Sequence, residues 1–455
     1  MESIVFQERI PVREKSYDVI VAGGGVAGLA AALTARRAGK EVLLVEKSTM
    51  LGGLATLGLI NLFVPMCNGR GTQIIFGLAE EFLRYSIRYG WAKIPEAWRN
   101  GQPEKPTEVR YTARFSPNIF AVALTEFFAA EGIDLLFDVT CSAPVMEGKH
   151  CRGVVIQGKS GREFIRGSVI VDTTGDADLL RRAGVPTLKR GNFTTYAVKA
   201  ITLESCRKAV ESGRIEDAIC ARAGYGVNLY GKDQPAEIPL CDGTDTDQVS
   251  RFLEINQRKL FERIKDEDPE SREIVTLPGM AQLRTTCCIE GDYTLRETDT
   301  YRHFDDSIGA ICDFERRDFL YEMPYRILIR SGYDYLITAG RSASGEGYAW
   351  DVIRVIPPAI ISGQAAGNAA VVALDSKCGI DKVDVAEVQK RQVTERDAPL
   401  RRRAHSQGCR PRRRKRGRHR AHLSRKLVRP VSALPRQVTG SAGSSSPLRR
   451  IPATS

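Results

Sequence analysis

The chain has 455 residues, of which 42% are apolar and 27% charged, with 41 glycines and 21 prolines. This composition is typical of a globular protein with about two or three domains, and it excludes a wholly disordered or collagen-like chain. The formal net charge of +12 is unevenly distributed, because residues 391–455 contain 19 Lys and Arg against 2 Asp and Glu. Residues 1–390 carry 48 basic and 53 acidic residues, so the body of the chain is mildly acidic.

The first predicted unit is a strand, a helix and a second strand. Residues 17–22 (YDVIVA) are a short β-branched run that ends in a glycine turn. Residues 26–38 follow with alanine-rich helical spacing, and Gly39 is expected to cap that helix at its C-terminus. Residues 41–46 (EVLLVE) form a second apolar strand. The crossover between the two strands requires a parallel, buried sheet.

The turn after the first strand matches the pattern G-x-G-x-x-G. Gly23 permits a tight turn, Gly25 lets the backbone approach a pyrophosphate, and Gly28 allows the helix to pack on the strand. The free N–H groups at the start of the helix then face the anion. Glu46 ends the second strand, where a carboxylate suits the two hydroxyls of an adenosine ribose. The unit therefore predicts a dinucleotide site, and both NAD and FAD fit it.

The next residues make the pattern more specific. Glu46-Lys47 ends the second strand, and Gly52-Gly53 follows a few residues later. This arrangement resembles the flavoprotein fold shared by glutathione reductases, succinate dehydrogenases and fumarate reductases. Within that superfamily, residues 15–380 are most similar to the bacterial FAD-dependent oxidoreductases. The resemblance implies an α/β fold: a Rossmann-like FAD-binding domain, with a parallel sheet and a β-meander, that contains an inserted α+β substrate domain.

Later stretches match the same family in order. Val139 lies in a strand where the family's backbone contacts adenine, and residues 169–178 (VIVDTTGDAD) resemble the strand that returns from the adenine side. Residues 336–341 (LITAGR) resemble the strand whose terminal glycine meets the ribityl phosphate. Residues 363–367 (GQAAG) belong to the predicted last helix, whose N-terminus near Pro357 would face the flavin. A helix dipole there stabilises negative charge on the reduced ring.

The resemblance implies FAD as the cofactor, a set of cofactor contacts and a division into domains. The expected contacts are Gly23, Gly25, Val26, Ala27, Gly28, Glu46, Lys47, Gly52, Gly53, Ala55, Thr56, Val139, Gly175, Gly340, Arg341 and Pro357. The FAD-binding domain is expected over residues 15–185 and 326–380, with the inserted substrate domain over residues 186–325. No metal site is predicted.

Candidate catalytic residues come from the insert and from the loop before the last helix. Arg284 lies in a stretch that resembles the family's arginine-rich segment, although Thr285 and a Cys-Cys pair stand where the family has Glu and two arginines. His303 suits proton transfer near neutral pH. Tyr348 and Arg354 are polar candidates near the flavin, and Arg354 is either a carboxylate clamp or a salt bridge at the helix start.

The expected reaction is hydride transfer between a small-molecule substrate and flavin N5, with an unidentified electron acceptor. An arginine would orient an acidic or hydroxylated substrate, and a His or Tyr would handle the proton. Disulfide reduction is disfavoured because Cys67 has no CxxxxC partner. Two alternatives stay open. One is an FAD-containing nucleic-acid-binding or tRNA-modifying protein that uses the basic tail, and the other is an interaction module in which FAD is structural.

The C-terminal stretch differs from the rest of the chain. Residues 383–390 (VDVAEVQK) indicate the start of a helix, and the apolar periodicity ends at about residue 391. The arginine-dominated segment that follows is expected to be a disordered tail. Because arginine greatly exceeds lysine there, beside Ala, Pro, Ser and Gly, we hypothesise a frameshifted terminus, which resequencing of the gene would test.

Cysteine usage and the apolar runs give an expectation about location. The 11 cysteines include no CxxC pair, and the first 15 residues are charged without an apolar leader, which favours reduced thiols in a cytoplasm. Residues 19–35 and 355–374 are uncharged but contain several glycines or prolines. We interpret both as buried strand-turn-helix segments and predict no membrane span.

Overall fold

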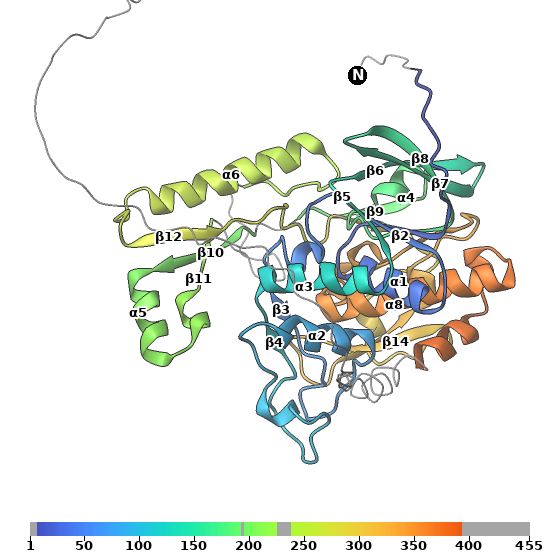
Figure 1. The fold of residues 1–455 in the computed structure, drawn as a ribbon. Helices are drawn as coiled ribbons and strands as arrows, with labels where there is room; N and C mark the ends of the chain where they lie inside the picture. Colours follow the sequence, from blue (N-terminus) through green and yellow to red (C-terminus); the bar gives the residue numbers. More distant parts are fainter. Residues whose placement is uncertain (1–6, 193–194, 225–237, 394–455) are drawn as a thin grey trace, which may run out of the picture. The chain divides into compact units, whose positions relative to one another are not determined.

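A seven-stranded sheet is the largest feature of the computed structural model, which describes residues 7–192, 195–224 and 238–393 (Figure 1). Its main path runs in the order β5-β2-β1-β8-β7-β6, and β16 also pairs with β8. The strands are β1 (Tyr17–Ala22), β2 (Val42–Glu46), β5 (Asp134–Phe137), β6 (Thr140–Glu147), β7 (His150–Gly158), β8 (Gly161–Asp172) and β16 (Leu336–Thr338).

The N-terminal unit forms as the sequence predicts. Strand β1 pairs in parallel with β2, with Val19 opposite Val42, and α1 (Val26–Arg37) makes the crossover. Gly39 lies just beyond the helix end at φ +85°, a conformation that favours glycine, and its N–H donates to the Arg36 carbonyl. Both strands are almost wholly buried, as a parallel sheet covered on two faces requires.

Strand β8 joins the parallel sheet to a β-meander. Its first residues pair antiparallel with β7, which pairs antiparallel with β6. From Gly167 onward it runs parallel to β1, and its last three residues also pair with β16. The predicted parallel sheet with a β-meander is therefore confirmed.

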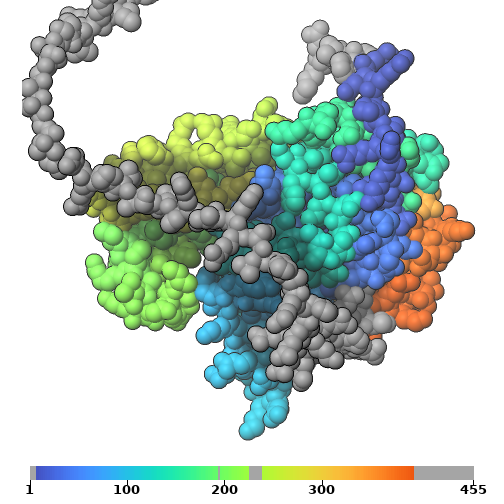
Figure 2. All heavy atoms as spheres, viewed as in Figure 1, coloured from blue at the N-terminus to red at the C-terminus, as the bar shows by residue number. Residues whose placement is uncertain are grey.

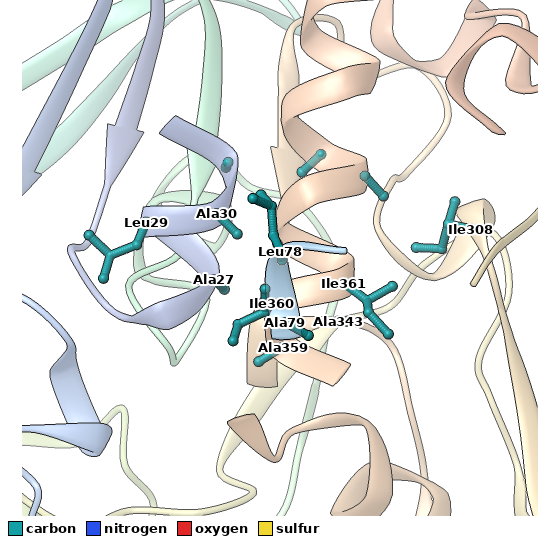
Figure 3. Packing of buried hydrophobic residues seen from close by; sticks show 14 of the residues in the cluster. Ala27, Leu29, Ala30, Leu78, Ala79, Ile308, Ala343, Ala359, Ile360 and Ile361 are labelled. Atoms are coloured by element: carbon teal, nitrogen blue, oxygen red, sulfur yellow. The ribbon is translucent and has the colours of Figure 1, made fainter. Parts of the chain in front are cut away.

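Helix α8 (Ile356–Ser376) is the central core helix and packs along α1. A Cβ at Gly363 would clash with the Ala27 carbonyl oxygen, and one at Gly367 would lie 2.6 Å from that of Ala31. The two contacts are four residues apart on both helices, so the helices run in the same direction. Figure 3 shows Ala27 beside the first turns of α8. Because seven residues of α8 precede Gly363, its N-terminus extends roughly 10 Å before the first turn of α1.

The insert contains a second, smaller sheet in the order β11-β10-β12. Its strands are β10 (Ala197–Thr202), β11 (Cys220–Ala223) and β12 (Arg272–Thr276), and its helices are α5 (Leu203–Ser212) and α6 (Thr246–Ile264). The sequence pattern predicts helices near residues 203–212 and 248–266, and α5 and α6 lie there within two residues at each end. Strands and helices are mixed here, as expected for an α+β insert, and Figure 2 shows the green and yellow-green surface of this region.

The remaining helices and strands of the described residues lie outside these two sheets. They are β3 (Leu62–Phe63), α2 (Leu78–Arg88), β4 (Ala113–Arg114), α3 (Pro117–Ala130), α4 (Asp178–Arg182), β9 (Thr187–Lys189), β13 (Cys287–Ile289), β14 (Ser307–Cys312), β15 (Leu320–Pro324) and α7 (Gly347–Ile353). The spacing of apolar residues over 72–90 (TQIIFGLAEEFLRYSIRYG) predicts a helix throughout that range, but α2 begins only at Leu78. Gly77 precedes it at φ +67°, and Gln73 forms a β-bridge with Cys67 instead of a helical turn. Residues 385–393 are helical, as the sequence indicates.

Two expectations concern the termini and the apolar runs. The basic tail falls on residues 391–455, of which all but the first three lie outside the described residues. Within the described ranges, no single helix is long and apolar enough to cross a membrane. Among the helices of the described residues, α7 and α8 reach that length and composition when they are taken together, and they are bent by 78° at a short break.

Candidate cofactor and substrate site

The two predicted glycine turns lie against each other. Gly25 forms a parallel β-bridge with Gly52, and the Gly52 N–H donates to the Gly24 carbonyl at 2.8 Å. A Cβ at Gly53 would stand 3.0 Å from the Gly25 Cα, so a side chain there would crowd the first turn. Gly25 itself faces open space, since no heavy atom of the described residues lies within 4 Å of its would-be Cβ. We call these two turns, residues 23–28 and 52–53, the glycine cradle.

The N-terminus of α1 opens onto the glycine cradle. Gly25 is its N-cap, no side chain caps it, and its first turn contains no acidic residue. Leu29 donates the first helical hydrogen bond, to the Gly25 carbonyl. The N–H groups that precede it, with the positive end of the helix dipole, suit an anion. At Gly28 a Cβ would clash with the Gly23 carbonyl oxygen, so this glycine is needed for close packing of helix and turn.

Glu46 stands at the edge of the cradle. Its buried carboxylate accepts a hydrogen bond from the Gly24 N–H at 2.6 Å through Oε2, and from the Ser48 N–H and hydroxyl at 2.8 and 2.6 Å through Oε1. Each carboxylate oxygen can accept more than one hydrogen bond, so these contacts orient the Glu46 carboxylate and leave it able to accept bonds from a ligand. The Val139 N–H donates to the Glu46 carbonyl at 3.2 Å, which brings the strand predicted for the adenine side to the same edge.

Arg341 ties the end of β8 to the insert. Its guanidinium donates to the Gly175 carbonyl at 2.7 Å, to the Leu283 carbonyl at 2.9 Å and to the Asp176 carboxylate at 2.6 Å. Its side chain is thus engaged by the protein, and the cofactor contact predicted for Arg341 would come from its backbone. The neighbouring Gly340 N–H donates to the Ser362 hydroxyl of α8, which places this turn beside the core helix.

Two segments of the insert cross over the loop that follows the second glycine turn. The Gln282 side chain donates to the Gly58 carbonyl at 2.6 Å, and the Gly279 N–H donates to that of Leu57 at 2.9 Å. The same Gln282 side chain accepts a bond from the Ala197 N–H at 2.7 Å. The first strand of the small sheet and residues 279–282 are therefore fixed over residues 57–58.

Arginines gather around one buried carboxylate next to this crossing. Asp351 of α7 accepts hydrogen bonds from Arg354 at 2.9 and 3.0 Å and from Arg190 at 3.4 Å. Burial lowers the pKa of Arg354, and the charges of Arg341 and Arg190 lower it further. Burial, followed by the charge of Arg354, lowers the pKa of Arg284 to about 10, while Asp351 opposes the shift. We call these four arginines with Asp351 the arginine cluster.

A half-buried lysine lies on β10, the strand of the small sheet that is fixed over residues 57–58; we call this crossing the junction. Lys199 projects from β10, and its ammonium donates to the Asn61 side-chain oxygen at 3.1 Å. Burial lowers the pKa of Lys199, and the nearby charge of Arg114 adds to the shift. Asn61 is held in turn, because its amide donates to the Phe115 carbonyl at 2.5 Å. A cation with a lowered pKa in a fixed position is a candidate for proton transfer.

The family model described as "FAD dependent oxidoreductase" matches residues 18–195 and 246–392. The chain belongs to this family. The match ends next to the predicted start of the basic tail, and it covers the glycine cradle and the arginine cluster. The family predicted from the sequence is confirmed, and with it the FAD cofactor.

The relatives of this FAD-dependent oxidoreductase carry several names. A digeranylgeranylglycerophospholipid reductase from Methanoculleus marisnigri is 30% identical over 185 residues, 38% of this chain and 43% of that protein. A reductase of the same name from Methanospirillum hungatei is 26% identical over 226 residues, 48% of this chain and 50% of that protein. The chain thus spans about half the length of these curated relatives.

One solved structure similar to this FAD-dependent oxidoreductase is that of a geranylgeranyl bacteriochlorophyll reductase-like protein from Thermoplasma acidophilum. It is 15% identical, covers 86% of this chain and 84% of its own, and has a TM-score of 0.41. The family assignment rests on the family model.

The glycine cradle of this FAD-dependent oxidoreductase fits its cofactor. The open space at Gly25, the uncapped start of α1 and the oriented Glu46 carboxylate provide for a pyrophosphate and a ribose. FAD, when bound, supplies a ring that accepts or donates two electrons with a proton. Gly23, Gly25, Gly28, Gly52, Gly53, Val139, Gly175 and Gly340 all lie at or beside this region, although individual FAD contacts stay predictions.

The four predicted catalytic residues do not come together. Arg284 and Arg354 share the arginine cluster. Tyr348 is buried and its hydroxyl donates to the Asp313 carboxylate at 2.9 Å. His303 is 76% exposed, and its ring pairs with the Glu322 carboxylate at 3.1 Å, which raises its pKa. The structure thus gives Arg284 and Arg354 a common surrounding and leaves His303 at the surface.

Sequence reasoning did not single out Lys199, Asp351 or Arg190. Lys199 lies in a strand whose alternation is weak, and no motif surrounds it. Asp351 lies three residues before Arg354, a spacing that brings two side chains together on a helix and could have indicated the pair. Cys67 is buried and accepts a hydrogen bond from the Tyr111 N–H, and each of the ten cysteines in the described ranges is free.

Proposed function

We propose that this protein transfers a hydride between a small-molecule substrate and the N5 atom of FAD. The observation that carries the proposal is the junction where insert residues 279–282 and strand β10 are fixed over the loop after the glycine cradle. A flavin whose pyrophosphate lies at α1 would extend toward this loop. In this proposal residues 15–185 and 326–380 hold the cofactor, and residues 186–325 cover the substrate.

The chain's own groups have distinct tasks. The first turn of α1 binds the pyrophosphate, and Glu46 binds the ribose hydroxyls. In space, the N-terminus of α8 extends beyond that of α1. Helix α8 has Pro357 in its first turn and no side-chain cap, so the positive end of its dipole would stabilise negative charge on the reduced ring. The insert excludes water from the reacting atoms and orients the substrate, which raises the effective concentration of the reactants.

We further propose that Lys199 handles the proton. During reduction of a substrate, its ammonium would donate a proton to the atom next to the carbon that receives the hydride. The hydrogen bond to Asn61 holds the ammonium in place, and the lowered pKa brings its deprotonation nearer to neutral pH. This task was assigned to a His or Tyr from the sequence. The exposed His303 and the Asp313-bonded Tyr348 support it less well.

The direction of transfer and the substrate are open within this proposal. Two relatives are named as reductases, and a third, from Sinomonas cyclohexanicum, is named 4-oxocyclohexanecarboxylate 2-dehydrogenase and is 50% identical over only 42 residues. The experiment therefore covers both directions, hydride transfer from the substrate to FAD and from reduced FAD to the substrate. The alternative of a tRNA-modifying protein depends on the basic tail, nearly all of which lies outside the residues that the family model matches.

The test uses the purified full-length chain under anaerobic conditions. Electron acceptors are screened for reoxidation of the flavin after photoreduction has bleached it, and hydroxy acids, sugars and amines are screened for reduction of the oxidised flavin. The proposal expects at least one small molecule to exchange electrons with the flavin, with slower transfer when the reacting carbon carries deuterium. A bound flavin that photoreduces but exchanges electrons with no small molecule would support a structural FAD and contradict the proposal.

A further inference from the structure

Two separate contacts join strand β10 to the loop that follows the glycine cradle. At the first, the Gln282 side chain bonds both Ala197 of β10 and Gly58 of the loop. At the second, the Lys199 ammonium donates to the Asn61 side-chain oxygen at 3.1 Å. Ala197 and Lys199 are two residues apart on β10. Gly58 and Asn61 are three residues apart in the loop. The strand and the loop are therefore held together at two neighbouring points.

The Gln282 amide bonds at both of its ends. Its oxygen accepts the Ala197 N–H at 2.7 Å, and its nitrogen donates to the Ala197 carbonyl at 3.1 Å and to the Gly58 carbonyl at 2.6 Å. Gln282 is 1% exposed, so water does not replace these bonds. A primary amide has an acceptor and two donors in one plane. Glutamate lacks the donors and asparagine is shorter by a methylene group, so neither makes the same three bonds.

Gln282 lies where the pairing of the small sheet stops. Strand β12 pairs with β10 from Lys199 to Thr202. Ala197 lies before that stretch, and its N–H and carbonyl both bond to the Gln282 amide. The amide thus continues the hydrogen bonding of β10 beyond the end of β12, and its other N–H reaches the Gly58 carbonyl of the loop. One buried side chain therefore determines how far this part of β10 lies from the loop.

The contact between Lys199 and Asn61 does not fix the strand by itself. A lysine side chain is a flexible four-carbon stem, so a single hydrogen bond from its ammonium leaves the backbone free to move. Asn61, in contrast, is held, because its amide donates to the Phe115 carbonyl at 2.5 Å. The ammonium stays on this fixed acceptor when β10 is at the right distance, and the planar Gln282 amide provides the rigid connection that sets this distance.

We propose that Gln282 is a positioning residue, which holds β10 so that the Lys199 ammonium stays on Asn61 and reaches the substrate. The importance of this position for turnover rests on the proposed function. The position itself does not, because the surroundings of Lys199 can be measured without a substrate. The competing explanation is that Gln282 only stabilises the fold, as a buried amide with three hydrogen bonds would.

The ionisation of Lys199 distinguishes the two explanations. Burial lowers the pKa of Lys199, and the charge of Arg114 adds to this effect. If β10 moves away from the loop, water reaches the ammonium and the pKa rises toward the ordinary value of a lysine. A purely structural task for Gln282 predicts lower stability with an unchanged Lys199 pKa.

The test uses the full-length holoprotein and two variants. Gln282→Met keeps a similar size without an amide, and Gln282→Asn is the milder change, with an amide one methylene group shorter. Competitive labelling with acetic anhydride over a pH series, read by mass spectrometry, gives the pKa of Lys199 itself. The matched control is Gln73→Met, because Gln73 is 5% exposed and its amide donates to the Ile75 carbonyl and the Glu80 carboxylate, outside the junction.

We expect the labelling curve of Lys199 to move to higher pH in both Gln282 variants, and further in Gln282→Met. With the substrate found in the screen, kcat should fall about 10- to 100-fold in Gln282→Met, the size of a misplaced reacting group, with a smaller change in KM. The alkaline fall of kcat should move to the same higher pH as the labelling curve. Gln73→Met should unfold at a lower temperature with the labelling curve of the parent. If Gln282→Met does not retain FAD, Gln282→Asn decides the question.

Two results would overturn the positioning task of Gln282. The first is a Lys199 labelling curve that is unchanged in both Gln282 variants while their unfolding temperature falls, which would leave Gln282 a task in the fold alone. The second is an equal shift of the curve in Gln73→Met, which would make the effect unspecific. A shifted labelling curve with no matching shift in the pH dependence of kcat has a different meaning. It would keep Gln282 as the residue that positions Lys199 and would contradict proton transfer by Lys199.

Discussion

We predict that glycine at position 25 is required for FAD binding but not for folding. Its φ of −69° and ψ of 172° suit any residue, and no heavy atom of the described chain lies within 4 Å of its would-be Cβ. Alanine is a poorer N-cap than glycine, so Gly25→Ala should lower the free energy of unfolding of the FAD-free protein by less than about 1 kcal/mol. The added methyl group occupies the space assigned to the pyrophosphate.

The expected loss of FAD affinity follows from the bonds that the methyl group would displace. Losing one hydrogen bond to a charged phosphate costs about 1.5–3 kcal/mol, which is roughly 10- to 100-fold in Kd. At an FAD concentration about 100 times the parent's Kd, the parent gains about 2.7 kcal/mol of stability from binding, and a variant with a 100-fold weaker Kd gains about 0.4 kcal/mol.

The assay compares thermal unfolding with and without added FAD, and fluorescence titration gives Kd. Gly28→Ala is the contrasting variant, because its Cβ would clash with the Gly23 carbonyl oxygen and should destabilise even the FAD-free protein by several kcal/mol. Parent-like FAD affinity in Gly25→Ala would refute the placement of the pyrophosphate at this turn.

Three further predictions concern the junction and its surroundings. If Lys199 donates the proton, kcat/KM for reduction falls as the pH rises through the lowered pKa of Lys199. The variant Lys199→Met should lose this alkaline fall, and its rate should be about 10²- to 10⁴-fold lower. An unchanged pH profile in the variant would exclude Lys199 as the proton donor. Arg341→Met breaks a nearly buried ion pair with Asp176 and should cost about 3 kcal/mol in urea unfolding; a loss under about 1 kcal/mol would show that the tie is dispensable. His303→Gln should leave kcat and KM unchanged, because the ring is exposed and pairs with Glu322, and a large fall in kcat would restore its predicted catalytic task.

The parts that could be predicted from the sequence are those that short-range patterns determine. Strand β1, helix α1 and the turn between them follow from a β-branched run, three glycines and an alanine-rich stretch within about 20 residues. Helix α5 begins and ends as predicted, since Thr202 caps it through Ser205 and Gly213 ends it at φ +67°. For α2 the helical spacing in the sequence begins at residue 72, six residues before the helix itself, because Gln73 forms a β-bridge with Cys67 in place of a first helical turn.

The junction could be predicted only in part. Arg284 was found through a family motif and Arg354 through its place before the last helix, but their shared surrounding depends on Asp351 and on Arg190, which lies far away in sequence. Lys199 meets Asn61 across 138 residues, and no local pattern reports such a contact. Long-range packing therefore determines the substrate side, whereas local glycine patterns determine the cofactor side.

The central claim, hydride transfer between a small molecule and bound FAD, is tested most directly by stopped-flow reduction of the flavin in the purified holoprotein. The substrate found in the screen is supplied once with hydrogen and once with deuterium at the reacting carbon. The proposal predicts one FAD per chain and flavin reduction that is several-fold slower with deuterium. Reduction at the same rate with both isotopes, under conditions where chemistry limits the rate, would contradict it.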